Sequence, residues 1–458
     1  MRKTFLLIAL LASLPLAAAE GPAVHRGIPR RQGRLWLEQD QCFVPVKPGG
    51  RLVVRADMGS LTVLPTSNDE GLHCQVRFTS YANSEPEARA SLLRSELSAR
   101  RLGSDGAFIE FRHPTDRPMS RLDVSFCILV PARFNLDLET ESGTIQVDNL
   151  DGDLRAATAG GDIHTADITG TARVQTAAGD IDLGNINQRL EAHTAGGSIR
   201  VGDVKGDAFL ETSGGEIVSG MVGGSVRAQT AAGDILLRGV GGPAIVQTAG
   251  GQIQLGECGG AVRAQTAAGS IHVDGARGRV DAETAGGSLD LLRLMSGVRA
   301  GTAAGHILAQ IGASRETFSS SSLDSSVGDL MVYLPSDLPL TVRAIIDVGG
   351  GHKIASDFPL AQRGEPGDWG VGPVQASAAL VGGGAPLNLH AALGNIEIRK
   401  LDPGSQARLK AYQQSFWSNW QEQTREQRRQ LDQLQKTMQQ LQQLLQQDFK
   451  AMSEANQP

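Results

Sequence analysis

Five arginines recur at one position of a repeating pattern, and their guanidinium groups could bind anions. They are Arg155, Arg173, Arg227, Arg263 and Arg299, and every spacing between them is a multiple of eighteen residues. A guanidinium pairs with a carboxylate through two parallel hydrogen bonds, so a row of them could hold an acidic glycan. Arginines also occur on the solvated face of a sheet, and the sequence leaves both interpretations open.

Three aspartates that directly follow a glycine suggest calcium binding. Asp162, Asp180 and Asp234 occupy equivalent positions, as the carboxylates of calcium-binding β-rolls do. The equivalent residues elsewhere are Ser198, Glu216, Gln252, Ser270, Ser288 and His306. A calcium ladder needs an oxygen ligand at nearly every corner. We therefore expect solvated corner residues, with no metal and no other cofactor.

The nine histidines do not form a pattern of metal ligands or a catalytic triad. His164 and His272 share a repeat position but lie six repeats apart, which is about 29 Å at the spacing of stacked strands. His193 and His306 occupy other positions. Because no nucleophile, base and acid converge, we expect a protein that is not an enzyme.

Four cysteines bear on disulfide chemistry, which an exported protein permits. Cys258 occupies a position that other repeats fill with Ile or Val, so we expect a buried apolar residue there. Cys42, Cys74 and Cys127 allow one disulfide. We take Cys42 with Cys127 as a working assignment, and the pairing among the three stays open.

A repeat of eighteen residues must position all of these side chains. A threonine and an apolar residue each recur ten times at this period. The threonines are Thr140, Thr158, Thr176, Thr194, Thr212, Thr230, Thr248, Thr266, Thr284 and Thr302, and the apolar residues are Ile145, Ile163, Ile181, Ile199, Ile217, Ile235, Ile253, Ile271, Leu289 and Ile307. Each repeat divides into two units of nine residues. Each unit is a glycine corner followed by a strand that alternates apolar and polar residues. We expect the glycine to supply a positive φ.

Three architectures could carry this period. A left-handed triangular β-helix needs a six-residue subperiod, which Ala156, Asp162 and Ile168 do not show. An antiparallel meander would place unlike halves side by side. A two-sided coil stacks identical positions on each other. We therefore predict an all-β protein, a β-solenoid similar to a parallel β-helix, with eighteen residues per coil made of two nine-residue units of strand and corner.

The threonine column could match an ice lattice if it faced solvent. Each threonine lies two residues after an apolar residue, as Thr176 does after Val174. On a strand the two therefore share the inward direction. We predict a buried column whose hydroxyls bond neighbouring coils or corner carbonyls.

Composition divides the chain into five segments. Residues 1–19 have the basic start, apolar run and small residues of a signal peptide, which predicts export to the periplasm or the cell surface. Residues 20–138 are predicted to form an irregular β region with one helix at about 85–102. Residues 139–311 are the regular repeats. Residues 312–402 are predicted to form looser β repeats and a cap. Residues 403–458 are predicted to form a Gln-rich, coiled-coil-like α-helical tail.

Apolar residues of the tail alternate in steps of three and four, as in a coiled coil. The residues of this oligomerisation helix are Trp417, Trp420, Leu431, Leu434, Met438, Leu441 and Leu445. The pattern predicts a homo-oligomer joined through the tail. The alternative is a single amphipathic helix docked on the open end of the solenoid.

Charge and hydropathy exclude two classes of partner. The net charge is −6 with both signs spread along the chain, so no basic patch for nucleic acid is present. After the first residues no stretch has the roughly 20 apolar residues of a spanning helix, so we expect no membrane span.

The repeats and the end of the β region resemble a known family. The G-[DST]-[IL]-x-[VL] repeats, the segment Ser356-Asp-Phe-Pro-Leu360 and the segment 380–396 are similar to the bacterial putative-adhesin family of β-strand-repeat domains of unknown function. The resemblance covers roughly residues 40–400 and implies an exported β-solenoid with an adhesive role. The family defines no catalytic residues, and the Gln-rich tail lies outside its pattern.

These features predict an exported, non-enzymatic β-solenoid that presents extended sheet faces for adhesion or interaction with the cell envelope. The sequence does not specify whether its partner is an envelope component, a glycan or a protein. The alternative is a carbohydrate-active β-helix enzyme acting on acidic polysaccharide, because such enzymes carry clustered carboxylates or basic residues in a groove on one face.

Overall fold

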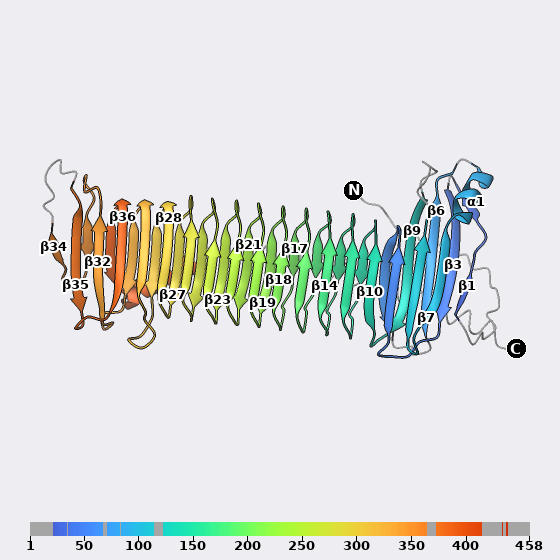
Figure 1. Cartoon of the computed structure of the whole chain (residues 1–458), viewed down its shortest axis with the longest axis horizontal. Coiled ribbons are helices and arrows are strands. Elements are labelled where there is room, and N and C mark those ends of the chain that lie inside the picture. Colours follow the sequence, from blue (N-terminus) through green and yellow to red (C-terminus); the bar gives the residue numbers. More distant parts are fainter. Residues whose placement is uncertain are drawn as a thin grey trace.

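The computed structural model describes residues 22–33, 35–66, 71–82, 84–113, 122–363 and 372–414, together with Gln433 and Thr437. Within these residues the chain is an elongated stack of short strands in two long sheets that face each other (Figure 1). The predicted signal peptide, residues 1–19, and the predicted oligomerisation residues from Trp417 to Leu445 lie outside the described residues.

The first sheet, called sheet A, has 19 strands within the described residues. They are β1 (Ala23–His25), β2 (Arg30–Gln32), β3 (Leu35–Val44), β5 (Ser60–Thr66), β6 (Leu72–Ser80), β9 (Leu122–Pro131), β11 (Ile145–Val147), β13 (Ile163–Thr165), β15 (Ile181–Leu183), β17 (Ile199–Val201), β19 (Ile217–Val222), β21 (Ile235–Val240), β23 (Ile253–Cys258), β25 (Ile271–Ala276), β27 (Leu289–Leu294), β29 (Ile307–Ile311), β31 (Leu330–Leu334), β33 (Ile354–Ser356) and β37 (Ile396–Lys400).

The second sheet, sheet B, has 18 strands in the same part of the chain. They are β4 (Arg51–Ala56), β7 (Glu96–Leu102), β8 (Gly106–Arg112), β10 (Asn135–Thr140), β12 (Leu154–Thr158), β14 (Ala172–Thr176), β16 (Leu190–His193), β18 (Ala208–Glu211), β20 (Val226–Gln229), β22 (Ala244–Gln247), β24 (Val262–Gln265), β26 (Val280–Thr284), β28 (Val298–Ala304), β30 (Ser321–Val327), β32 (Leu340–Ile346), β34 (Ala361–Arg363), β35 (Val374–Leu380) and β36 (Ala385–Leu393).

Through the middle of the chain the strands stack in parallel and in register. In sheet B, β12 pairs with β14 so that Thr158 lies beside Thr176. In sheet A, β13 pairs with β15 so that Ile163 lies beside Ile181. Partners are eighteen positions apart, which matches the period of the sequence. The prediction of two long parallel sheets of repeating strands is therefore confirmed, and an antiparallel meander is excluded for these strands.

The threonine column is buried between the sheets. Its members are between 2% and 8% exposed. The hydroxyl of Thr176 donates to the carbonyl of Gly161 at 2.8 Å and accepts from the backbone N–H of Gly179 at 3.2 Å. The same pair of bonds recurs at Thr248 and its neighbours. The prediction of an inward column bonded to corner carbonyls is confirmed.

Close backbone contact, rather than a positive φ, requires glycine at the repeat corners. Between Gly161 and Gly287 the glycines that precede each apolar-column residue lie outside the left-handed region, so the expected role of positive φ is wrong there. A Cβ at Gly251 would lie 2.0 Å from the carbonyl oxygen of Gly233 in the preceding coil. No side chain fits in this space.

Each end of the stack is assembled out of sequence order. At the N-terminal end, β4 and β5 lie between β8 and β9 on one side and β10 and β11 on the other. At the C-terminal end, β36 and β37 lie between β30 and β31 on one side and β32 and β33 on the other. Antiparallel strands follow: β6 and β3 in sheet A, β7 in sheet B, and β35 and β34 at the far end. The antiparallel strands cover the edges of the parallel stack at β9, β8 and β32.

Two predictions for the terminal regions need correction. The helix predicted at 85–102 is shorter, because α1 spans Glu85–Leu93 and the following residues form β7, antiparallel to β8. The spacing of Leu92, Leu93 and Leu97 fits a helix, but pairing with β8 outweighs this local preference. The last two strands of the segment predicted to form looser repeats and a cap, β36 and β37, lie inside the stack rather than at its end.

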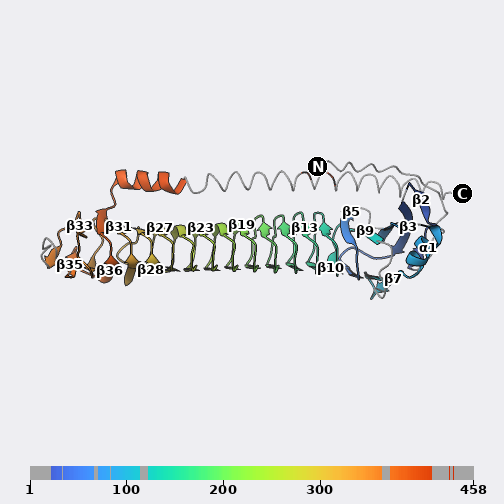
Figure 2. The ribbon, with the colours of Figure 1, turned by 90° about the horizontal axis from the view of Figure 1, so that it is seen from above.

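A second helix, residues 403–414, lies along the outer face of sheet A (Figure 2). Asp402 begins it by accepting the backbone N–H of Ser405 at 2.7 Å. Leu409 is buried, and the hydroxyl of Tyr412 donates to Asp290 of β27 at 3.1 Å. The described start of the tail therefore docks on the side of the stack rather than on its open end. Among the residues described, no helix is long and apolar enough to cross a membrane.

Candidate functional site

The five predicted arginines lie in one row across the outer face of sheet B. From β12 to β28 the register places in this row Arg155, Arg173, Glu191, Phe209, Arg227, Ile245, Arg263, Asp281 and Arg299. We call these residues the sheet B row. In β14 the exposed residues alternate with buried ones, so the row faces away from the core.

The arginines of the row differ in their partners. Arg173 pairs with Glu191 at 3.1 Å, and Arg189 pairs with the same carboxylate at 2.9 Å. The other four form no ion pair with any described residue. These four are Arg155, Arg227, Arg263 and Arg299. Their guanidinium donors therefore remain accessible to an external anion.

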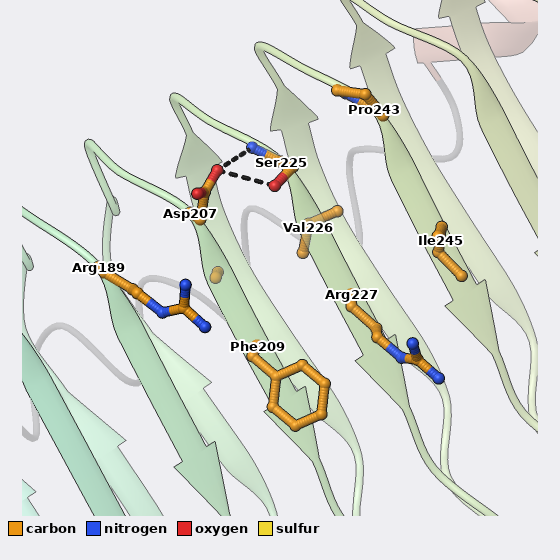
Figure 3. A pocket seen from close by; sticks show the side chains of 9 residues that line it. Arg189, Asp207, Phe209, Ser225, Val226, Arg227, Pro243 and Ile245 are labelled. Atoms are coloured by element: carbon orange, nitrogen blue, oxygen red, sulfur yellow. Dashed lines mark hydrogen bonds between the residues drawn. The ribbon is translucent and has the colours of Figure 1, made fainter.

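Phe209 places an aromatic ring in the row, within a shallow depression (Figure 3). The depression is lined by Arg189, Asp207, Ala208, Phe209, Ser225, Val226, Arg227, Pro243 and Ile245. The guanidinium carbon of Arg227 lies 5.9 Å from the centre of the Phe209 ring. Ile245 is 40% exposed and extends the apolar surface beyond Arg227. An apolar patch bordered by guanidinium groups suits the apolar face of a sugar that carries an acidic group.

A ladder of side-chain amides runs beside the row. Gln229 donates to Gln247 at 2.6 Å, Gln247 to Gln265 at 2.8 Å, and Gln265 to Glu283 at 3.0 Å. Each bond joins neighbouring coils and fixes the orientation of the amide. The ladder makes this face flat and polar, and the amide groups can exchange hydrogen bonds with hydroxyl groups.

The corner aspartates bind the backbone of the next coil. Asp162 accepts the N–H of Asp180 at 2.9 Å, Asp180 that of Ser198 at 2.8 Å, and Asp234 that of Gln252 at 2.7 Å. One carboxylate oxygen of each is thus used to join coils. The described residues contain no group of three His, Cys, Asp or Glu side chains that could hold a metal ion.

The two histidines that share a repeat position lie in separate environments. His164 Nδ1 is 3.3 Å from Asp182, and a hydrogen bond to that carboxylate raises the pKa of the imidazole. His272 is buried near the second helix, with Nε2 3.0 Å from Asp274. The structure does not bring these two histidines together.

The aromatic ring and the amide ladder were not assigned to this surface from the sequence alone, although both can be recognised there. Phe209 is the single aromatic residue between Glu139 and Gln310, and it occupies the repeat position of the arginines. Gln229, Gln247 and Gln265 recur at the period of eighteen. These two patterns show that the side chains lie on the surface only when it is known which positions of each strand face outward.

A pair of carboxyl groups was also missed in the N-terminal cap, by which we mean strands β1 to β9 and helix α1. Glu38 and Asp40 lie two residues apart on β3, and Asp40 accepts the backbone N–H of Gly27 at 2.9 Å. Burial, together with the charge of Asp40, raises the pKa of Glu38 to about 7. Raised carboxyl pKa values occur at acid-base sites and also in structural pairs.

This shift predicts a loss of stability with rising pH. The pKa of Glu38 is about 7 in the folded chain, compared with 4.5 for the free side chain. The stability that the neutral carboxyl contributes is therefore fully present below about 4.5 and is lost as the pH rises through about 7. Replacing Glu38 by Gln should remove this dependence and stabilise the cap at pH 8 by about 1–2 kcal/mol, after allowance for partial exposure.

Thermal unfolding at pH 5 and pH 8, followed by circular dichroism, checks this prediction. Glu141→Gln changes an exposed turn residue and should keep the wild-type pH dependence. If Glu38→Gln also keeps it, the assignment of the raised pKa to Glu38 is wrong.

Comparisons with known proteins find similar structures but no match to a family model or to a curated protein. A structure described as a putative cell adhesion protein from Clostridium sporogenes is 11% identical, covers 81% of this chain and 100% of its own, and has a TM-score of 0.16. A putative adhesin from Bacteroides fragilis is 11% identical, covers 81% of this chain and 98% of its own, and has a TM-score of 0.21. Both descriptions name the class of protein that the sequence resembles. At these levels of similarity we argue function from the residues of this chain.

Proposed function

We propose that this chain is an exported, non-enzymatic β-solenoid that holds an acidic glycan of the cell envelope against the outer face of sheet B. The observation that carries the proposal is the sheet B row, in which Arg227 lies beside the half-buried ring of Phe209 and the unpaired Arg263 and Arg299 follow along the same row. Guanidinium groups bind the acidic groups of a glycan, and the ring packs against the sugar. Export rests on the predicted signal peptide, residues 1–19.

The repeat makes the surface suited to a polymer. Arg227, Arg263 and Arg299 are each two coils apart, which is about 10 Å at the spacing of stacked strands. One extended polymer can therefore contact several arginines at once. Linked contacts raise the overall affinity well above that of one site.

The alternative function, cleavage of an acidic polysaccharide, needs an acid and a base on either side of one glycosidic bond. The carboxylates in and beside the row are already engaged. Glu191 pairs with two arginines, Asp281 pairs with Arg279 at 3.3 Å, and Glu283 accepts from Gln265. These contacts favour a binding role for the face.

Retention of residues 20–458 on immobilised polysaccharides of equal size tests the proposal. We expect acidic polysaccharides to retain the protein at low salt and to release it at about 0.5 M salt, because the contacts are ionic and exposed. Neutral polysaccharides should not retain it. Absence of retention on every acidic polymer would count against binding, and new reducing or unsaturated ends in the incubated polymer would overturn the non-enzymatic role.

We also infer that the tail joins copies of the chain. The apolar pattern from Trp417 to Leu445 supports this, and the helix at 403–414 leads into it. Deleting residues 403–458 should lower the mass measured by light scattering while the β signal in circular dichroism persists. Deleting only 415–458 keeps the helix that covers sheet A and should lower the mass equally. An unchanged mass in both variants would contradict oligomerisation through the tail.

A further inference from the structure

Two cysteines lie directly opposite each other in the N-terminal cap. β3 and β6 are antiparallel neighbours, and their register pairs Cys42 with Cys74. Both side chains are buried, at 3% and 1% exposed, and both belong to the apolar core. The structure holds them as thiols that point into the same space.

The register satisfies the geometry of a disulfide without backbone movement. Directly opposed residues of antiparallel strands have Cα atoms about 4.5 or 5.5 Å apart, and disulfides join Cα atoms about 4.4–6.8 Å apart. The two thiols are also in contact. A hydrogen bond between Cys42 and Cys74, together with burial, raises the pKa of the Cys74 thiol.

The other two cysteines are poorly placed to compete. On β9, Cys127 is the partner of Gln75, whereas Cys74 is the partner of Ile128. Because side chains alternate along a strand, Cys127 points to the opposite face of sheet A from Cys42 and Cys74. The working pairing of Cys42 with Cys127 is therefore wrong. Cys258 lies in β23, where it is buried between the sheets as the sequence predicted.

We propose that Cys42 and Cys74 form a disulfide that fastens β3 to β6 and closes the N-terminal end of the stack. β3 carries the short strands β1 and β2, so the bond would hold the whole outer edge of sheet A. The oxidant is a disulfide, either of a small thiol or of an oxidoreductase. Its S–S bond accepts two electrons and both thiol protons and leaves as two thiols, while one S–S bond forms in the chain. Such an oxidant is present in the compartments that export reaches.

Peptide mapping tests the bond. Residues 20–458 are incubated with glutathione disulfide, both folded and during refolding, and are then denatured, alkylated and digested with trypsin. We expect peptide 35–51 to be linked to peptide 56–77, while peptides 122–133 and 239–263 carry the alkyl label on Cys127 and Cys258. Cys127→Ser and Cys258→Ser should leave the link in place. Labelling of all four cysteines under both conditions, or a link to peptide 122–133, would overturn the proposal.

Thermal unfolding separates the bond from the packing of the two thiols. Reductant should lower the midpoint of the oxidised wild type by about 5 °C. The midpoint of Cys74→Ser should be insensitive to reductant, whereas that of Cys127→Ser should fall as the wild type does. Equal insensitivity of wild type and Cys74→Ser would show that no bond is present. This outcome is independent of glycan binding, which lies on another face.

Discussion

Replacing Gly251 by Ala is expected to lower the free energy of unfolding by about 3 kcal/mol, whereas replacing its neighbour Gly250 should change it by less than about 1 kcal/mol. The added Cβ at Gly251 would meet the carbonyl oxygen of Gly233 at 2.0 Å and its carbonyl carbon at 2.4 Å. Both atoms belong to backbone, so the two coils must move apart. That movement also strains the bonds that join Gly251 to Thr248 and Thr266.

Gly250 provides the matched control because it differs from Gly251 by one position only. A Cβ there would lie 3.4 Å from the nearest atom, the carbonyl oxygen of Ala232. The equivalent positions of other repeats already hold Ala178, Ala232 and Ala268. Urea unfolding of the two variants, followed by circular dichroism, gives the comparison. Equal stability would contradict the backbone contact between coils.

The period of the sequence predicts the middle of the fold because each residue of the threonine and apolar columns has a partner of the same kind one coil away. Thr176 shows this: its inward direction follows from Val174 two residues earlier, and the structure confirms it. The role of the corner glycine could not be predicted in the same way. Close approach and positive φ both require glycine, and only the distance between coils separates them.

The ends of the stack could not be predicted because their pairings carry no period. Leu52 of β4 lies beside Leu136 of β10, and the intervening residues form other strands of the cap. Spacing also misled where it fitted two structures, as at Leu97, which was taken as part of a helix and lies in β7. In both cases the deciding contact comes from a distant segment of the chain.

The sequence predicts where the arginines of the candidate site lie, but not which of them form ion pairs. The repeat places Arg173 and Arg227 in the same row, yet the first pairs with Glu191 and the second contacts the ring of Phe209. Which arginines stay unpaired depends on the residue in the next coil. The amide ladder likewise becomes a surface feature only when Gln229 and Gln247 are known to face outward.

Replacing Arg227, Arg263 and Arg299 together by Ala is expected to weaken binding to acidic polysaccharide at least about tenfold. Each guanidinium is exposed and unpaired in the described part of the chain, so each can contribute a charge-assisted hydrogen bond, and a tenfold loss corresponds to about 1.4 kcal/mol. The loss should shrink as salt rises, since the contacts are at the surface. Stability should change little, because these side chains make no ion pair with described residues.

The matched control removes the same charge from arginines that already have partners. Arg112 pairs with Glu110 at 2.6 Å, Arg89 with Glu85 at 2.9 Å, and Arg399 with Glu397 at 2.9 Å. Replacing these three by Ala changes the net charge equally but leaves the unpaired arginines of the sheet B row intact. A specific surface and a general effect of charge therefore give different results.

The most direct test of the account is the affinity of the wild type and the two triple variants for one acidic polysaccharide, measured by biolayer interferometry at low and at moderate salt. We predict that the Arg227, Arg263 and Arg299 variant loses binding at low salt while the Arg112, Arg89 and Arg399 variant binds within about twofold of the wild type. Equal loss in both variants, or no loss in either, would contradict a glycan-binding role for the outer face of sheet B.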